Sequence, residues 1–125
     1  MIIGTGIDIV DKTRIQMMIE KHGERFVRRI LTESEITLVP LGGRKSEFIA
    51  GRFAAKEAFA KATGFGFGER LSFQDIELTR DSYGKPYLKI REDWTQVHYP
   101  DQEIHFHVSI SHEKKYAIAQ VIIEG

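Results

Sequence analysis

Two hydrophobic periods alternate along this chain of 125 residues. Apolar residues at every second position predict strands, and a spacing near 3.6 predicts helices. Strands are expected over residues 1–10, 72–79, 87–90, 103–111 and 116–123, and helices over 13–30, 32–39, 48–63 and 91–97. The mixed order predicts an α+β fold, an antiparallel sheet packed around a long central helix. No linker or repeat interrupts it, so residues 1–125 are predicted to form a single domain.

Local signals mark several helix ends. The segments Thr13–Gln16 and Thr32–Glu35 both have the capping-box pattern, in which a hydroxyl and a side chain three residues later bond reciprocally to the backbone. The first helix is expected to run to about Ile30, with a bend at Gly23. Pro40 is expected to end the second helix, since it cannot continue one.

Composition excludes several classes of protein. No run approaches the roughly 20 apolar residues of a membrane span, and Asp8 interrupts the apolar N-terminus, so neither a membrane anchor nor a signal peptide is expected. The chain has no cysteine, which excludes disulfides and thiolate nucleophiles and favours a cytoplasmic location. Lys and Arg number 18, as do Asp and Glu, so nucleic acid is not the expected main partner.

The central helix has two unlike faces. One is aromatic and suited to a core, whereas the other carries Glu57 and Lys61 one turn apart, beside Ala50 and Ala54. Small neighbours would let a bulky ligand approach, so we interpret this face as a ligand-facing strip. The alternative is a solvated ion pair worth a few tenths of a kcal/mol. Basic residues before this pair and a glycine-spaced stretch after it favour the first interpretation.

The first helix also carries a basic stripe. If the helix continues through Gly23, one stripe combines four cations with an adaptable methionine, which suits docking to an acidic helical partner. A solvated basic face is the alternative. The residues of this stripe are Arg14, Met18, Lys21, Arg25 and Arg28.

Asp8 is a carboxylate within a predicted strand, between Ile7 and Ile9. Such a group needs compensation by a cap, an ion pair or a cation. A magnesium ion shared with Glu57 would also supply it, because Mg²⁺ takes one or two protein carboxylates and completes its shell with water and substrate phosphates. Neither carboxylate belongs to a local metal-binding motif.

Five groups of motifs follow one another in a fixed order along the whole chain. These motifs are Gly4-Thr5-Gly6-Ile7-Asp8-Ile9-Val10, Phe26-x-x-Arg29-Ile30-Leu31-Thr32-x-x-Glu35, Arg52-Phe53-Ala54-Ala55-Lys56-Glu57-Ala58-x-x-Lys61-Ala62, Gly84-Lys85-Pro86, and Ser109-Ile110-Ser111-His112 ahead of Tyr116-Ala117-Ile118-Ala119. Their order resembles that of the holo-(acyl-carrier-protein) synthase family, the small trimeric type of 4'-phosphopantetheinyl transferase, and the chain is identified by this resemblance as a member.

The resemblance implies a reaction in fatty acid synthesis. Coenzyme A would donate its 4'-phosphopantetheine arm to a serine of apo acyl carrier protein, releasing adenosine 3',5'-bisphosphate. By the family pattern, Asp8 and Glu57 would hold Mg²⁺ on the pyrophosphate, and Lys61 would contact the same phosphates. Glu57, directly or through a water, would accept the serine proton.

The resemblance also implies a coenzyme A site completed between subunits of a homotrimer. The basic stripe of the first helix would then receive the carrier protein. Phe65 and Phe67 stand where the family has smaller or polar residues. Candidate ligands for the coenzyme A phosphates are Arg44, Arg52, Lys56 and Lys61, and candidate walls of the pocket are Gly64, Pro86, Ser111 and His112.

Other functions compete with this assignment. A Mg²⁺-dependent hydrolase of the coenzyme A or nucleotide pyrophosphate would need the same carboxylates, and a non-catalytic module that binds carrier protein would not. A serine hydrolase built on Ser111 and His112 has no nucleophile-elbow context. His105 and His107 point to one side of a strand but are more typical of a surface than of a metal site.

Overall fold

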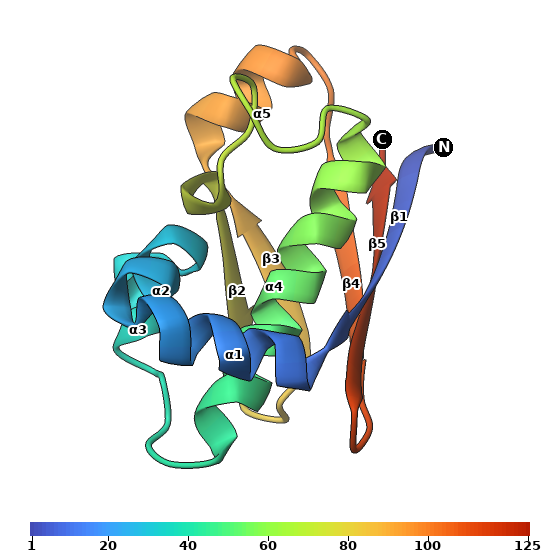
Figure 1. Cartoon of the computed structure of the whole chain (residues 1–125). Helices are drawn as coiled ribbons and strands as arrows, with labels where there is room; N and C mark the ends of the chain where they lie inside the picture. Colours follow the sequence, from blue (N-terminus) through green and yellow to red (C-terminus); the bar gives the residue numbers. More distant parts are fainter.

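The computed structural model covers residues 1–125 and is organised around one long helix, α4 (Arg44–Thr63), which lies against a three-stranded sheet (Figure 1). The sheet has the order β1-β5-β4 and is antiparallel throughout. Its strands are β1 (Ile2–Asp11), β4 (His105–His112) and β5 (Tyr116–Glu124). The predicted α+β class, with an antiparallel sheet packed around a long central helix, is confirmed.

Shorter elements surround this unit. A second hairpin pairs β2 with β3, and three helices cover the flank of α4 away from the sheet (Figure 1). None of the helices combines the length and the hydrophobicity that a membrane-spanning helix requires. The remaining elements are α1 (Lys12–His22), α2 (Glu24–Ile30), α3 (Glu33–Ile36), a 3₁₀ turn at Phe73–Asp75, β2 (Ile76–Arg80), β3 (Pro86–Ile90) and α5 (Glu92–His98).

Small residues allow β1 to pass very close to α4. A Cβ atom on Gly6 would lie 1.9 Å from the carbonyl oxygen of Ala58, and one on Gly4 would lie 2.0 Å from that of Ala62. Only glycine fits at such a crossing. Ala50 and Ala54 have no exposed surface. The predicted ligand-facing strip is therefore wrong for these two alanines, because their methyl groups pack inside the protein.

The three-stranded sheet has one face on α4 and one face outward. Alternate residues of β5, such as Ala119 and Val121, are buried against the helix. The outward face is also apolar along β1, where Ile7 and Ile9 are 57% and 60% exposed. Ile9 lies opposite Ile118 of β5. An exposed apolar strip of this kind is typical of an interaction surface.

The N-terminal helical region differs from the predicted continuous helix. Gly23, with φ 56° and ψ −135°, separates α1 from α2. The predicted capping box over Thr13–Gln16 is wrong: the Asp11 carboxylate, two residues before Thr13, accepts the Thr13 backbone N–H at 2.8 Å. Gln16 instead donates to Glu20. The stripe predicted along one helix is thus divided between two.

Two other boundaries follow from local capping. Both reciprocal bonds of the Thr32–Glu35 capping box are present, as predicted. The strand predicted from residue 72 begins only at Ile76, because the Asp75 carboxylate accepts the Ser72 N–H at 2.9 Å and closes a 3₁₀ turn.

The close crossing of β1 and α4 can be tested through stability. Gly6→Ala should lower the free energy of unfolding by about 1–3 kcal/mol, the usual range for forcing a methyl group into a packed core. Urea denaturation followed by circular dichroism measures this change. Gly68→Ala is the matched control, since nothing lies within 4 Å of a Cβ there; equal effects of the two substitutions would contradict the steric explanation.

Candidate active site

Strand β1 and helix α4 bring two carboxylates and an ammonium group together. The Nζ atom of Lys61 lies 3.1 Å from Oδ1 of Asp8 and donates to the carbonyl oxygen of Ile7 at 2.9 Å. Glu57 precedes Lys61 by one helical turn on the same side of α4. The close crossing at Gly6 is what carries Asp8 up to the helix. The structure therefore assembles the predicted trio of Asp8, Glu57 and Lys61.

We call Asp8, Glu57 and Lys61 the acidic cluster. Its two carboxylates repel each other, and Lys61 offsets part of that repulsion. Partial burial raises the pKa of Glu57, and the negative charge of Asp8 raises it further, against the smaller opposing effects of Lys61 and Arg14. A divalent cation between the two carboxylates would relieve their repulsion, so the donor set fits a hard metal ion. The structure contains no group of three or more His, Cys, Asp or Glu side chains placed to hold a metal ion. A metal here would draw its other ligands from water or substrate.

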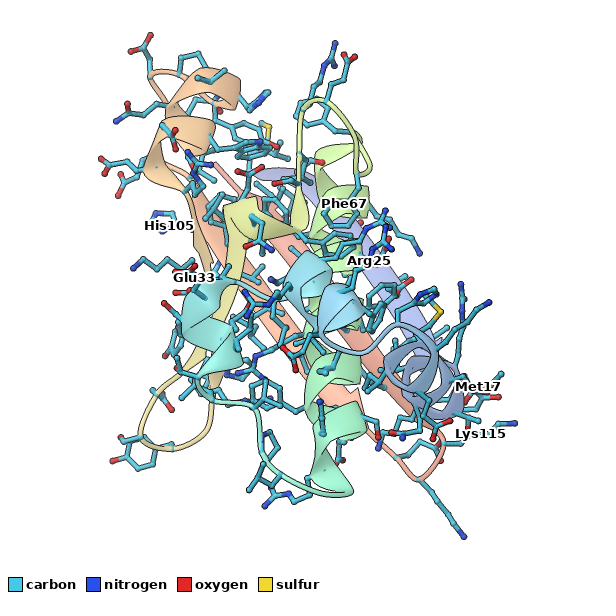
Figure 2. The ribbon with its side chains drawn as sticks, turned by 60° about the vertical axis from the view of Figure 1, so that its left-hand side comes forward. Met17, Arg25, Glu33, Phe67, His105 and Lys115 are labelled. Carbon is cyan, nitrogen blue, oxygen red and sulfur yellow. The ribbon has the colours of Figure 1, made fainter.

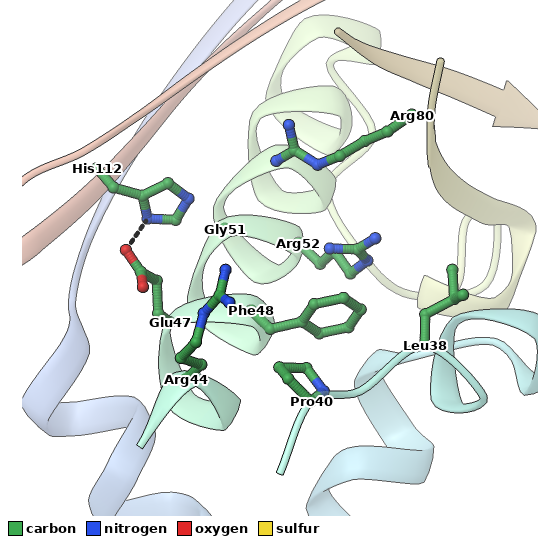
Figure 3. A pocket seen from close by; sticks show the side chains of 9 residues that line it. All are labelled: Leu38, Pro40, Arg44, Glu47, Phe48, Gly51, Arg52, Arg80 and His112. Atoms are coloured by element: carbon green, nitrogen blue, oxygen red, sulfur yellow. Dashed lines mark ion pairs between the residues drawn. The ribbon is translucent and has the colours of Figure 1, made fainter. Parts of the chain in front are cut away.

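A second group of polar residues lines a cavity of about 570 Å³ beside the N-terminal half of α4 (Figure 3). Three arginines face it from two elements, and only one carboxylate accompanies them. We call this cavity the arginine pocket. Its lining residues are Leu38, Pro40, Arg44, Glu47, Phe48, Gly51, Arg52, Arg80 and His112.

Arg52 is held rigidly at the wall of the arginine pocket. Its side chain is almost completely buried, its Nε lies 3.5 Å from the Glu35 carboxylate, and its guanidinium carbon lies 3.6 Å from the centre of the Phe48 ring. Burial is the main cause that lowers the pKa of Arg52, to about 10. The Nε atom has no hydrogen-bond partner. A buried guanidinium with spare hydrogen-bonding capacity is suited to an anion.

Lys56 has a different position from the one predicted. Its ammonium group has no exposed surface and donates to Glu35 at 2.6 Å, to the carbonyl of Ile30 at 2.8 Å and to that of Phe73 at 3.2 Å. Since an ammonium has three hydrogens, these acceptors satisfy it. We therefore do not retain Lys56 as a ligand for phosphate, and assign it to the core.

The other predicted wall residues are dispersed. His112 faces the arginine pocket, while Ser111 points to the opposite, exposed face of β4, which excludes a paired serine–histidine hydrolase site. Pro86 is the cross-strand partner of Arg80 and so adjoins the pocket. Gly64, with φ 79°, ends α4 beyond Lys61. The sequence patterns did not indicate Arg80, because only the packing of β2 against α4 in the folded chain brings it to the pocket.

The acidic cluster and the arginine pocket lie on different sides of α4. At about 100° per residue, Glu57 is about 180° around the helix from Phe48 and about 140° from Arg52. The strands agree with this separation, because Asp8 lies on β1 and His112 on β4, at opposite edges of the sheet with β5 between them. Within one chain the two groups therefore face different directions.

A smaller, apolar cavity of about 220 Å³ lies among α1, α2 and α4, with Glu57 in its wall. Two residues of the predicted stripe, Arg14 and Met18, line it; Lys21, Arg25 and Arg28 are absent from the lining. Figure 2 shows Arg25 at the surface of this part of the molecule. The remaining lining residues are Ile15, Phe26, Arg29, Ile30, Phe53 and Phe73.

Comparison with known proteins covers essentially the whole chain. The sequence model of the 4'-phosphopantetheinyl transferase superfamily matches residues 4–121. The chain is 52% identical over 126 residues to the holo-(acyl-carrier-protein) synthase of Halalkalibacterium halodurans, a match that covers 99% of this chain and 97% of that protein.

Solved structures agree with the sequence match. The holo-(acyl-carrier-protein) synthase of Bacillus anthracis in complex with CoA (3',5'-ADP) has a TM-score of 0.85 and 46% identity, and the match covers 100% of this chain and 98% of that chain. The synthase of Neisseria meningitidis has a TM-score of 0.90 and 37% identity, with both chains covered completely.

Proposed function

The chain belongs to the 4'-phosphopantetheinyl transferase superfamily, and from this premise we propose that it acts as a single-domain holo-(acyl-carrier-protein) synthase. It transfers 4'-phosphopantetheine from coenzyme A to a serine of an apo acyl carrier protein of fatty acid synthesis. The serine oxygen bonds to the phosphorus that bears the pantetheine arm, the phosphoanhydride bond breaks, and adenosine 3',5'-bisphosphate leaves. One observation carries the proposal: the same fold holds an acidic cluster suited to a metal–pyrophosphate group and a separate arginine pocket suited to a phosphate.

Each residue of the acidic cluster has a role in this reaction. Asp8 and Glu57 would hold Mg²⁺, which, when bound, neutralises charge that develops on the leaving phosphate. Lys61, anchored to Asp8 at 3.1 Å, supplies a positive charge to the same phosphates. Glu57, directly or through a water, would accept the serine proton.

The arginine pocket is proposed to hold the adenosine 3'-phosphate end of coenzyme A. Arg44, Arg52 and Arg80 provide cationic donors, and the Arg52 side chain is already largely desolvated. A planar guanidinium group can donate two parallel hydrogen bonds to two oxygens of one phosphate. Pro86, beside Arg80, adjoins the same end of the ligand.

The opposite placement of these groups favours a site shared by two copies of the chain. One coenzyme A would contact the arginine pocket of one copy and the acidic cluster of its neighbour. The exposed isoleucines of the sheet, Ile7 and Ile9 among them, offer an apolar surface for the association. We therefore propose a homotrimer with active sites between its subunits.

The carrier protein is proposed to dock on α1 and α2. The apolar cavity beside Glu57 can receive an apolar side chain, and Arg14 and Arg29 at its wall match the acidic surface expected of the partner. Lys21, Arg25 and Arg28 add positive charge nearby. The serine of a protein bound here is directed towards Glu57, the proposed base.

The reaction class can be tested by mass. The protein should be incubated with coenzyme A, Mg²⁺ and an apo acyl carrier protein, and the carrier protein should then gain the mass of one phosphopantetheine group. Coenzyme A cleaved without this gain would establish a hydrolase instead. Carrier protein bound without turnover would establish a binding module.

The acidic cluster predicts a metal-dependent loss of turnover. Asp8→Ala or Glu57→Ala should lower the transfer rate by about 10²-fold or more, the scale on which a preorganised charge-stabilising group acts. Initial rates over a range of Mg²⁺ concentrations give the measurement, and circular dichroism checks the fold. Glu92→Ala, at an exposed carboxylate of α5, is the control. Near-normal rates in both cluster variants at limiting Mg²⁺ would contradict the two-carboxylate site.

A shared site predicts complementation between defective chains. Mixing unfolded Glu57→Ala and His112→Ala chains and refolding them together should restore activity, because about a quarter of the sites in a random cyclic mixture would take an intact half from each. Glu57→Ala mixed with Asp8→Ala is the matched control: both lesions lie in the acidic cluster, so no hybrid site is complete. A fully active monomer in sedimentation would exclude this arrangement.

Docking on the basic face predicts a selective effect on the carrier protein. Lys21→Glu with Arg25→Glu should raise the KM for carrier protein by about threefold to tenfold, as expected for two charges at the rim of an interface. The KM for coenzyme A should be unchanged, and added salt should affect the variant less than the wild type. Lys89→Glu, on β3, is the control. An unaltered carrier-protein KM would mean that the face is merely solvated.

A further inference from the structure

Three titratable side chains from three elements meet at the edge of the arginine pocket. The Nζ atom of Lys12, at the start of α1, lies 3.2 Å from Oε1 of Glu47 in the first turn of α4. The same carboxylate oxygen lies 3.8 Å from Nδ1 of His112, the last residue of β4 (Figure 3). Glu47 is the only carboxylate that lines the pocket.

Lys12 fixes this carboxylate through a network that extends to the β4–β5 turn. Its Nζ also donates to the carbonyl oxygen of Glu113 at 2.6 Å, and its backbone N–H donates to that of Lys115 at 2.9 Å. The ammonium is largely buried, with 16% of the side chain exposed. It holds the pKa of Glu47 below the usual value. Glu47 is thereby kept ionised and directed towards Lys12 and His112.

The ring of His112 is held in one orientation. A Cβ atom on Gly51 would lie 2.9 Å from Cε1 and 3.0 Å from Nε2 of His112, so the ring occupies the space that a side chain on α4 would fill. Figure 3 shows Nδ1 directed towards Glu47 and the second nitrogen directed towards α4 and the pocket. The two nitrogens thus have different environments.

The charges around this ring leave it neutral in the free protein. Burial, with the positive charges of Lys12 and Arg80, lowers the pKa of His112, and the opposing effect of Glu47 is smaller than burial. Arg44 adds a further positive charge on the same pocket wall. A phosphate dianion in the pocket would reverse this balance, because it would offset the arginines and accept a hydrogen bond from Nε2.

We propose that Glu47 is a positioning residue that couples phosphate binding in the arginine pocket to the uptake of one proton by His112. With Nδ1–H directed at Glu47, Nε2 takes a proton from water and donates it in a hydrogen bond to a phosphate oxygen. No covalent bond of the ligand changes. The inference rests on the proposed function, since the ligand used to test it is coenzyme A.

Calorimetry measures the coupling directly. Coenzyme A should be titrated into the protein near pH 7.5 in buffers of different ionisation enthalpy, whose comparison counts the protons exchanged. The wild type should take up about one proton per site when coenzyme A binds, and its affinity for coenzyme A should fall as pH rises. Glu47→Gln and His112→Ala should reduce the uptake towards zero, and Glu47→Asp should restore part of it.

Nuclear magnetic resonance provides a readout independent of the ligand. The nitrogen shifts of His112 in the free protein should report a proton on Nδ1, and Glu47→Gln should lower the pKa of His112. Glu124→Gln is the matched control, because Glu124 pairs with a histidine at the other end of β4, 3.0 Å from Nε2 of His107; it should leave the His112 titration unchanged. An unchanged His112 titration in Glu47→Gln, or proton uptake equal to that of the wild type, would overturn the inference.

The two proposals fail in different ways. Coenzyme A that binds tightly without His112-dependent proton uptake would overturn the coupling and leave the transferase assignment intact. Dephospho-coenzyme A, which lacks the 3'-phosphate, should bind with less uptake; equal uptake would place the coupled phosphate elsewhere and contradict the inference. No binding of coenzyme A to any form of the protein would remove the proposed function itself.

Discussion

The arrangement of the helices depends on the hydrogen bonds that the buried carboxylate of Glu35 accepts. This carboxylate has no exposed surface, and it accepts hydrogen bonds from the Lys56 ammonium at 2.6 Å and from the backbone N–H groups of Thr32 and Leu78. Three elements, α3, α4 and β2, are therefore joined at one charge. A buried carboxylate without these partners would be strongly destabilising. The neighbouring Arg52 obtains its fixed position at the pocket wall from the same group.

A second constraint is the lack of side chains where β1 crosses α4. It allows the strand to bring Asp8 close to Lys61 and Glu57 of the acidic cluster. The backbone of β1 lies against the helix at Gly4 and Gly6, and the strand then delivers Asp8 to Lys61. Bulky residues at the crossing would move the strand outward and separate the carboxylates. The structural requirement of the crossing and the proposed catalytic role of Asp8 thus share one short segment of sequence.

Sequence patterns predicted the element types well, because strand alternation and helical spacing are local properties. They also gave the trio of Asp8, Glu57 and Lys61, through motif order. Local patterns failed where a distant segment decides the outcome: Lys56 resembles a surface cation in sequence, yet its acceptors come from Ile30, Glu35 and Phe73. The capping of α1 by Asp11 was missed because Thr13 offered a competing capping signal two residues later, and the bend expected at Gly23 is a complete break between two helices.

The placement of the acidic cluster and the arginine pocket on different sides of one helix has a consequence for symmetry. In the proposed shared site these two groups are half-sites that face different ways, and they would define a head-to-tail contact, in which each copy offers one surface and receives the other. A pair of copies joined in this way leaves one half-site open at each end. Only closure into a ring engages every half-site, and a contact whose rotation did not close would generate a filament.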